Sequence, residues 1–132
     1  MLGGRAAGPR GGVQERRQLR AALDVAERPT LVRVRKGAVA DPIARVRRLG
    51  SLDVLHESGD GAVDLLIVGV GTMAATSVSV AEKLEAQGLS VRVVDPCWLL
   101  PVSPDLVSAV GEATAVAVIE GDLLSGGIGS RV

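Results

Sequence analysis

The stretch VDLLIVGVGTMAATSVSVAEKLEAQGLSVRVVDPCWLLPVSPD, residues 63–105, decides the fold of this chain. It opens on an unbroken apolar run to Val70, which is typical of a strand covered on both faces, as in a parallel sheet. After a glycine turn, helical spacing predicts a helix over 73–87 with an inner stripe of Met73, Val80, Ala81 and Leu84. A second apolar strand follows over 91–94. The order strand, helix, strand predicts a parallel sheet with helices on its faces.

The residues after this stretch continue the alternation. Ser103 is a good helix cap and Pro104 suits the first helical position, so a short helix is expected up to Gly111. A third apolar strand is expected over 115–119. Residues 126–130 then resemble the glycine turn that opens a helix, yet only two residues follow. We therefore expect an open α/β fold with a mostly parallel twisted sheet, incomplete at its C-terminal end, with one sheet face left bare.

The residues before the deciding stretch are less regular. Leu52 to His56 alternates weakly and a Gly-Asp-Gly turn follows at 59–61, which predicts a hairpin whose first arm is an antiparallel edge strand. Further upstream we expect a helix over 14–26 and a short strand over 30–34. The Gly-, Arg-, Ala- and Pro-rich start of the chain predicts a disordered leader.

Composition excludes several classes of protein. A chain of 132 residues is one domain's worth, and a lone cysteine excludes an internal disulfide or a multi-cysteine metal site. One tryptophan without Phe or Tyr provides no stacking platform for single-stranded nucleic acid. No stretch reaches the roughly 20 apolar residues of a membrane span, and no secretory signal is present, so a cytoplasmic chain is expected.

Charge is distributed unevenly, although the formal net charge is zero. Of the 15 basic residues, 12 lie before Leu49, against 4 of the 15 acidic residues. Two interpretations stay open at this point. The basic half is either a solvated, poorly ordered leader or a surface that binds phosphate or nucleic acid.

One motif is typical of a nucleotide site. Gly69, Gly71 and Ala74 form a G-x-G-x-x-A turn between a strand and a helix, and Asp95 closes the following strand. This spacing fits a dinucleotide fingerprint, in which glycines admit a pyrophosphate and the acid binds a ribose. A small NAD-binding module that uses Gly69, Gly71 and Asp95 is therefore one hypothesis. The alternative is a glycine turn with a purely structural role.

Two further features concern single side chains. Arg33, Arg35 and Lys36 leave a strand together, where they either bind a phosphate through bidentate hydrogen bonds or form a solvated edge. Cys97 has no positive neighbour in the local sequence that would lower its pKa, which favours a buried structural thiol.

Three segments, in order, resemble one known family. They are TLVRVRKG at 30–37, the block at 63–105, and VIEGDLLSGGIGSRV at 118–132. Together they resemble 1-deoxy-D-xylulose-5-phosphate synthase, a transferase that uses thiamine diphosphate and is related to transketolase. The resemblance runs from about Gln14 to Val132.

The resemblance implies a division of the chain and a limit on its chemistry. It implies a disordered leader over 1–13, a remnant of the preceding pyrimidine-binding-type domain over 14–37, a linker over 38–50, and a partial transketolase-like C-terminal domain over 51–132. In this family the catalytic glutamate and the ligands of the diphosphate and Mg²⁺ lie in two upstream domains. We therefore expect no catalytic, cofactor-binding or metal-binding residue here, and neither thiamine diphosphate nor Mg bound by this chain alone.

One site residue carries over from the family. Arg33 matches the arginine that binds the phosphate of glyceraldehyde 3-phosphate. Around it the chain departs from the family pattern, with Val34 for an aromatic residue and Arg35 for proline, and farther along with Cys97 for arginine and Gly121 for an acid.

These departures suggest a fragment or divergent paralogue of the synthase, which joins pyruvate to glyceraldehyde 3-phosphate in isoprenoid precursor biosynthesis. Such a chain is expected to be inactive alone and to have a structural, dimer-supporting role. The implied partners are a second copy or the missing synthase domains, with no membrane and no nucleic acid. The NAD-binding module remains the alternative.

Overall fold

The computed structural model describes residues 4–38, 41–121 and 127–131. No helix in this part of the chain has the length and apolar character needed to cross a bilayer. In chain order the elements are β1 (Arg5–Ala7), α1 (Gly12–Leu23), β2 (Thr30–Val32), β3 (Arg47–Leu49), β4 (Leu52–Glu57), β5 (Val63–Gly69), the 3₁₀ turn η1 (Gly71–Met73), α2 (Ala74–Glu85), β6 (Val91–Asp95), β7 (Trp98–Leu100), α3 (Pro104–Glu112), β8 (Ala113–Ile119) and the 3₁₀ turn η2 (Ile128–Ser130).

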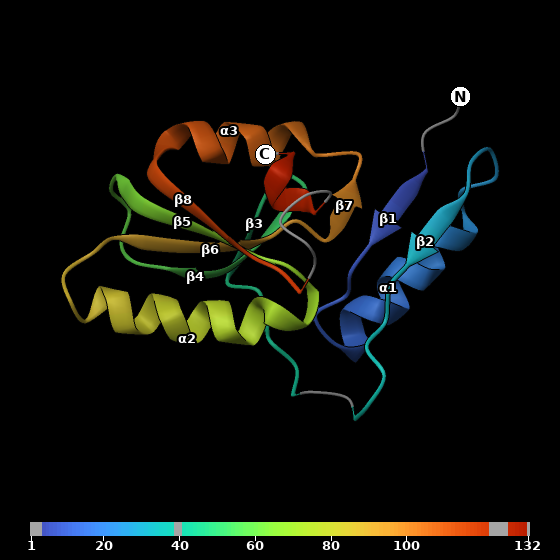
Figure 1. Cartoon of the computed structure of the whole chain (residues 1–132), viewed down its shortest axis with the longest axis horizontal. Helices are drawn as coiled ribbons and strands as arrows, with labels where there is room; N and C mark the ends of the chain where they lie inside the picture. Colours follow the sequence, from blue (N-terminus) through green and yellow to red (C-terminus); the bar gives the residue numbers. More distant parts are fainter. Residues whose placement is uncertain (1–3, 39–40, 122–126, 132) are drawn as a thin grey trace.

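The main sheet has the strand order β3-β4-β6-β5-β8. Its core, β6-β5-β8, is parallel, whereas β4 runs antiparallel to β6 and β3 antiparallel to β4. Helix α3 covers one face and α2 the other (Figure 1). The predicted α/β fold with a mostly parallel open sheet is therefore confirmed, whereas the expectation of a bare sheet face is wrong, because a helix packs against each face.

Strand β5 explains why its sequence is apolar without interruption. Its side chains alternate between the two faces of the sheet, so Leu66 joins the α3-side core while Ile67 joins the α2-side core. Both are 1% exposed. Burying side chains of this size contributes about 1.5–3 kcal/mol each. On the α2 side, the buried helix positions are Ala74, Ser77 and Ala81.

The predicted hairpin is wrong. Strand β4 pairs with β6 and β3, not with β5, so it is antiparallel but lies inside the sheet. The tight turn sits at Gly50, whose φ of +60° suits glycine, and it joins β3 to β4. β3 lies in the stretch 38–50, which was expected to be a linker. The strand was not predicted, because Arg47 and Arg48 leave it without an apolar alternation. Pairing with β4, and the ion pair of Arg47 with Glu57, hold it in place.

Residues 5–7 and 12–13 form regular structure, although a disordered leader was expected over 1–13. Strand β1 pairs with β2 in parallel and with β7 antiparallel, forming a second, small sheet. Arg10 lies buried against the main sheet. Composition did not predict this ordered structure, because the partners of β1 and Arg10 lie far away in the sequence.

Helix α1 buries polar side chains and exposes the apolar ones that its sequence pattern predicts to be buried. Its buried residues are Gln14 and Gln18, while Val13, Leu19 and Leu23 are 55%, 45% and 86% exposed. Gln18 donates a hydrogen bond to the Cys97 carbonyl, and Gln14 donates to Asp95. The helix is thus attached through polar contacts and leaves its apolar stripe facing outward.

At the other end of the chain, the short predicted helix forms as α3. The Ser103 hydroxyl accepts a hydrogen bond from the Asp105 amide at 3.1 Å, as expected of an N-cap. Of the predicted glycine turn at 126–130, Gly126 lies outside the described residues, and Ile128–Ser130 forms η2. The Glu120 carboxylate accepts hydrogen bonds from the amides of Ile128 and Gly129 and holds this turn beside β8.

Candidate functional site

A cavity of about 300 Å³ opens where the carboxyl end of β5 meets the small sheet. Ligands of open α/β sheets typically bind outside the carboxyl ends of the strands. The cavity is shaped by the β5–η1 turn, the exit of β2 and the start of the β1–α1 connection. Its lining residues are Gly8, Pro9, Arg33, Val34, Arg35, Val70, Gly71, Thr72, Leu99 and Gly121.

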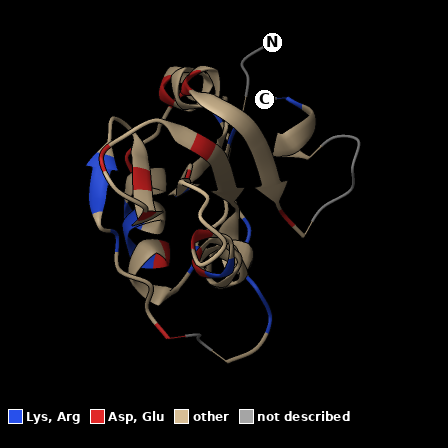
Figure 2. Cartoon of the chain, turned by 90° about the vertical axis from the view of Figure 1, so that its left-hand side faces the viewer, with Lys and Arg blue, Asp and Glu red and all other residues tan. Residues whose placement is uncertain are grey.

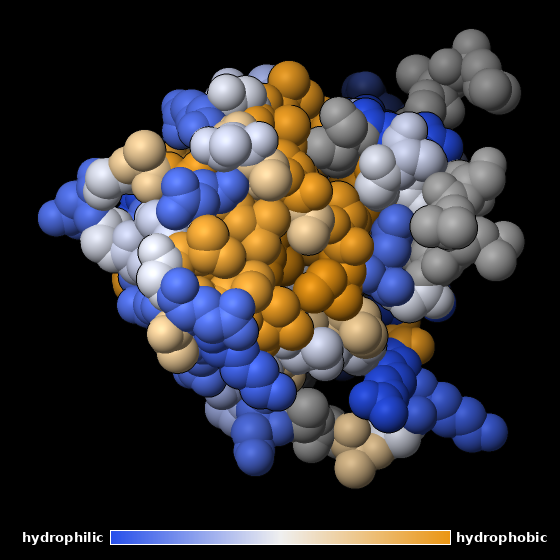
Figure 3. Space-filling view, turned by 60° about the vertical axis from the view of Figure 1, so that its left-hand side comes forward, coloured by the Kyte–Doolittle hydropathy of each residue, from blue (hydrophilic) through white to orange (hydrophobic). Residues whose placement is uncertain are grey.

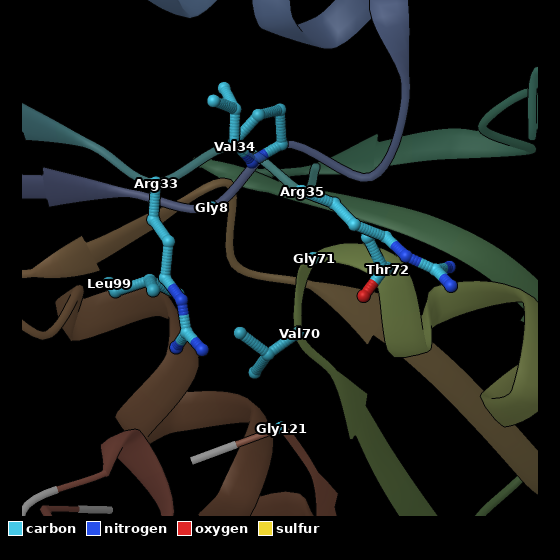
Figure 4. A pocket seen from close by; sticks show the side chains of 10 residues that line it. Gly8, Arg33, Val34, Arg35, Val70, Gly71, Thr72, Leu99 and Gly121 are labelled. Atoms are coloured by element: carbon cyan, nitrogen blue, oxygen red, sulfur yellow. The ribbon is translucent and has the colours of Figure 1, made fainter. Parts of the chain in front are cut away.

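Arg33 provides a cation in this cavity. Its amide donates a hydrogen bond of 2.9 Å to the Ala7 carbonyl, which extends the β1–β2 pairing by one residue. Figure 4 shows its side chain reaching toward Val70 and Gly121, beside Leu99. A guanidinium next to apolar walls suits a small anion, since its planar donors match two phosphate oxygens.

Of the other two basic residues of the run, Arg35 also lines this cavity, but its side chain points away from Arg33. The Arg35 side chain extends to the far side of the Gly71–Thr72 turn (Figure 4), where it also lines a neighbouring, smaller pocket with Glu15. Lys36 is not among the residues that line the cavity. Of the three predicted phosphate-binding candidates, the structure therefore directs Arg33 and Arg35 to opposite sides of one turn.

The dinucleotide hypothesis is contradicted by the place of Asp95. This carboxylate is 0% exposed, and its Oδ2 accepts hydrogen bonds from Arg10 at 2.8 Å and Gln14 at 2.9 Å. Its Oδ1 accepts a hydrogen bond from the Cys97 amide. An acid enclosed in this way cannot bind a ribose. Gly71 lines the cavity, with a φ of +57° that favours glycine, but none of the described residues that line this cavity is acidic.

Gly69 has a packing role. A β-carbon at this position would lie 2.6 Å from the Ser77 hydroxyl and 3.3 Å from the Ala74 α-carbon, both in the first turns of α2. Ser77 is fully buried and donates a hydrogen bond to the Met73 carbonyl. Glycine is therefore required for α2 to lie close to β5.

We expect Gly69→Ala to lower the free energy of unfolding by about 1–3 kcal/mol, since the extra methyl group overpacks this contact. Urea denaturation measures the change. The matched control is Gly61→Ala, where nothing lies within 4 Å of the added carbon. Adding Ser77→Gly should make the double variant more stable than the sum of the two single effects. If the two effects on the free energy of unfolding were strictly additive, the contact between positions 69 and 77 would be contradicted.

A buried ionic cluster lies beneath the small sheet. Arg10 Nη1 is 2.8 Å from Asp53 and 2.8 Å from Asp95, which are register partners on β4 and β6. Burial raises the pKa of Asp95, against the opposing effect of Arg10. Burial would also raise the pKa of Asp53, but the Arg10 hydrogen bond and nearby arginines lower that pKa below its ordinary value. This cluster fastens the start of the chain to the main sheet.

The donor set does not suit the metal of a diphosphate cofactor. Across residues 4–38, 41–121 and 127–131, no three His, Cys, Asp or Glu side chains gather in a way that could hold a metal ion. The buried carboxylates of Asp53 and Asp95 are bridged by Arg10. The carboxylates of the described residues thus do not fit the metal ion of such a cofactor.

Comparison with known proteins places this geometry in context. The family model "Transketolase, C-terminal domain" matches residues 60–132. A 1-deoxy-D-xylulose-5-phosphate synthase of Mycobacterium sp. (strain KMS) is 45% identical over 131 residues, which is 98% of this chain and 20% of that protein. The synthase of Rhodococcus erythropolis is 46% identical over 129 residues, with 97% and 20% covered. The chain spans about a fifth of these relatives.

Two solved structures share the fold. One, titled a split gene transketolase, inactive beta4 tetramer, has a TM-score of 0.80 and 28% identity over 96% of this chain and 42% of its own. The transketolase of Campylobacter jejuni has a TM-score of 0.66 and 17% identity, over 98% of this chain and 24% of its own. The second likeness concerns the fold alone.

Proposed function

The chain belongs to the transketolase C-terminal domain family, and we propose that it is a supporting part of a 1-deoxy-D-xylulose-5-phosphate synthase, inactive by itself. The observation that carries this proposal is the 45% identity to such synthases along nearly the whole chain, together with a span of only a fifth of their length. In the proposed reaction, pyruvate and glyceraldehyde 3-phosphate form 1-deoxy-D-xylulose 5-phosphate.

The division of labour follows from where the chemistry resides. Thiamine diphosphate and its Mg²⁺ would be held by upstream domains, and this cofactor would supply the carbon–carbon bond chemistry. The present chain would contribute the C-terminal domain and one wall of the substrate site. A structural neighbour that is titled a split gene transketolase, inactive beta4 tetramer, supports the idea that such a domain can exist on a separate, inactive chain.

Within this role, Arg33 would bind the phosphate of glyceraldehyde 3-phosphate. Three features support the assignment: its place within the TLVRVRKG segment, its position in the lining of a cavity of about 300 Å³, and the apolar residues Val70 and Leu99 that line the same cavity. Pockets for small molecules commonly combine such walls with a few polar groups.

The proposal is tested by complementation. The purified chain is mixed with a polypeptide that comprises the Mycobacterium synthase without the region matched here, in the presence of thiamine diphosphate and Mg²⁺. Neither polypeptide alone should form 1-deoxy-D-xylulose 5-phosphate from the two substrates, whereas the mixture should. Product formation by the chain alone, or an inactive mixture in which the polypeptides do not associate, contradicts the supporting role.

The phosphate assignment is tested on the chain alone. We expect Arg33→Ala to weaken the binding of glyceraldehyde 3-phosphate about 10- to 100-fold, since hydrogen bonds to charged groups contribute about 1.5–3 kcal/mol. An NMR titration of the labelled chain measures the affinity. The Arg33→Lys variant keeps the charge but lacks the planar guanidinium, so its affinity should lie between those of the wild type and Arg33→Ala. Arg16→Ala, an exposed change on α1, is the control. If the Arg33→Ala variant binds glyceraldehyde 3-phosphate as tightly as the wild type does, the assignment is rejected.

A further inference from the structure

A second cavity, of about 350 Å³, opens between the start of α1 and the segment that leads to β3. The described residues that line it belong to 10–17 and 42–45, and none of them lines the cavity around Arg33. Pockets that bind small molecules have volumes from about 300 Å³ upward. This Arg10 cavity is therefore large enough for a small organic molecule and separate from the proposed phosphate site.

Arg10 brings unused hydrogen-bond donors to this cavity. Its Nε donates to the Ile43 carbonyl at 3.1 Å, and its Nη1 donates to Asp53 and Asp95 at 2.8 Å each. A guanidinium also carries two N–H groups on Nη2. No described residue accepts a hydrogen bond from Nη2, and this nitrogen keeps contact with solvent. Two donors of a side chain that is only 8% exposed are therefore left for an occupant of the cavity.

The Arg10 cavity is positively charged. Arg17 and Arg45 line it together with Arg10, and none of its described lining residues is acidic. Glu15 on α1 lines a neighbouring, smaller cavity instead. Arg45 lies 3.3 Å from Asp53, whereas Arg17 forms no ion pair with any residue that the structure describes. Figure 2 shows further basic residues on β3, the strand that follows this segment. Arginines gathered around a concave surface raise the local concentration of anions.

Apolar residues complete the wall of the cavity. Val13 is 55% exposed there, and Pro42 and Ile43 line the other side. Elsewhere on the molecule, an apolar patch bordered by hydrophilic residues covers the middle of the face seen in Figure 3. A patch of that kind suits an apolar partner. The mixed walls of the Arg10 cavity instead suit a molecule with a charged end and an apolar end.

We propose that the Arg10 cavity binds a small organic anion. The carboxylate or phosphate group of this anion accepts hydrogen bonds from Nη2 of Arg10 and from Arg17 and Arg45, because guanidinium donors match two oxygens of either group. Its short apolar body contacts Val13 and Ile43. The two aspartates hold Arg10 in place before the anion arrives, which lowers the cost of binding. This inference concerns the isolated chain and does not depend on the synthase reaction proposed above.

An NMR titration of the labelled chain tests the proposal, with butyl phosphate and butanoate as the probes. The chain carries Arg33→Ala throughout, so that anions bound at the other cavity do not contribute. The amide signals of Gly11 and Ala44, which line the Arg10 cavity, should shift as the probe is added. Arg17→Gln and Arg45→Gln should each weaken binding about tenfold, because each removes a charged hydrogen-bond donor. Arg16→Gln is the matched control, since Arg16 is exposed on the same helix but does not line the cavity.

The apolar wall is tested by Val13→Thr, which places a hydroxyl group there with little change of shape. This variant should weaken the binding of butyl phosphate and leave the binding of inorganic phosphate unchanged. Circular dichroism verifies the fold of each variant. Tighter binding of butyl phosphate identifies the natural ligand as a phosphate ester, and tighter binding of butanoate identifies it as a carboxylic acid.

Three outcomes would overturn the proposal. The first is that neither probe shifts the signals of Gly11 and Ala44 at millimolar concentrations. The second is that uncharged butanol binds as tightly as the two anions, which would make the cavity an apolar site. The third is that Arg17→Gln and Arg45→Gln change the affinity no more than Arg16→Gln does.

Discussion

Replacing Arg10 with methionine is expected to lower the free energy of unfolding by about 3–5 kcal/mol, the cost of breaking a buried ion pair from one side. The Arg10 side chain is 8% exposed, and its partners Asp53 and Asp95 are 4% and 1% exposed. Without the guanidinium, two carboxylates face each other across adjacent strands with no buried cation between them. Urea denaturation at pH 7 measures the loss.

Arg47→Met is the matched control, because it removes the arginine of an arginine–carboxylate pair at the surface of the protein. The Arg47 side chain is 41% exposed and lies 2.7 Å from Glu57. Exposed pairs of this kind contribute about 0–1 kcal/mol. Equal losses for the two variants would mean that the buried cluster is no more important to stability than a surface ion pair.

The pH dependence of the Arg10→Met effect has a definite sign. Arg10 lowers the pKa of both Asp53 and Asp95 in the folded chain, so removing it raises both values. Protonation then neutralises the unpaired carboxylates and removes most of the penalty. The difference in stability between wild type and variant should therefore shrink as the pH falls from 7 toward 4. A difference that grows in acid would contradict this account.

The Cys97 thiol is expected to react with iodoacetamide on the order of a thousandfold more slowly at pH 8 than a thiol in the unfolded chain. Burial raises its pKa to about 12, and the nearby charges of Asp95 and Asp53 add to the effect. Only the thiolate reacts, and an ordinary thiol has a pKa of about 8.5. Mass spectrometry of timed samples measures the rate.

The same chain in guanidinium chloride is the reference for this rate. Below the pKa of about 12, the folded-state rate should rise about tenfold for each pH unit, because the thiolate fraction rises by that factor. A plateau near pH 9 would show an ordinary thiol. It would also remove the argument that Cys97 is a structural residue, held by the Gln14 amide at 3.2 Å from its sulfur.

Local signals in the sequence were sufficient for the parallel core. The apolar run of β5, the glycine turn after it and the Ser103 cap each act over a few residues, and each forms as expected. The pairing of β4 with β6 could not be predicted in this way, because it depends on strands that other elements separate along the chain.

The candidate site shows the same contrast. Arg33 was identified by its segment, and its place in a cavity depends on β1 and β5, which the segment does not contain. Arg10 was missed because it stands in a run of Gly and Pro, 43 and 85 residues before the two aspartates that it joins. The outward apolar stripe of α1 was also unexpected, since periodicity locates an apolar face but not what covers it.

The position of β4 between β3 and β6 limits where this polypeptide can be truncated. The family match starts at residue 60, after β4 has already passed through the sheet. A fragment excised at that boundary would lose Leu52 and Val54 from its interior and would expose the edge of β6. A fragment that folds by itself must begin upstream of Arg47. It must also include Arg10 if the charge of Asp53 is to stay neutralised. Affinity tags and fusion junctions therefore belong ahead of β1.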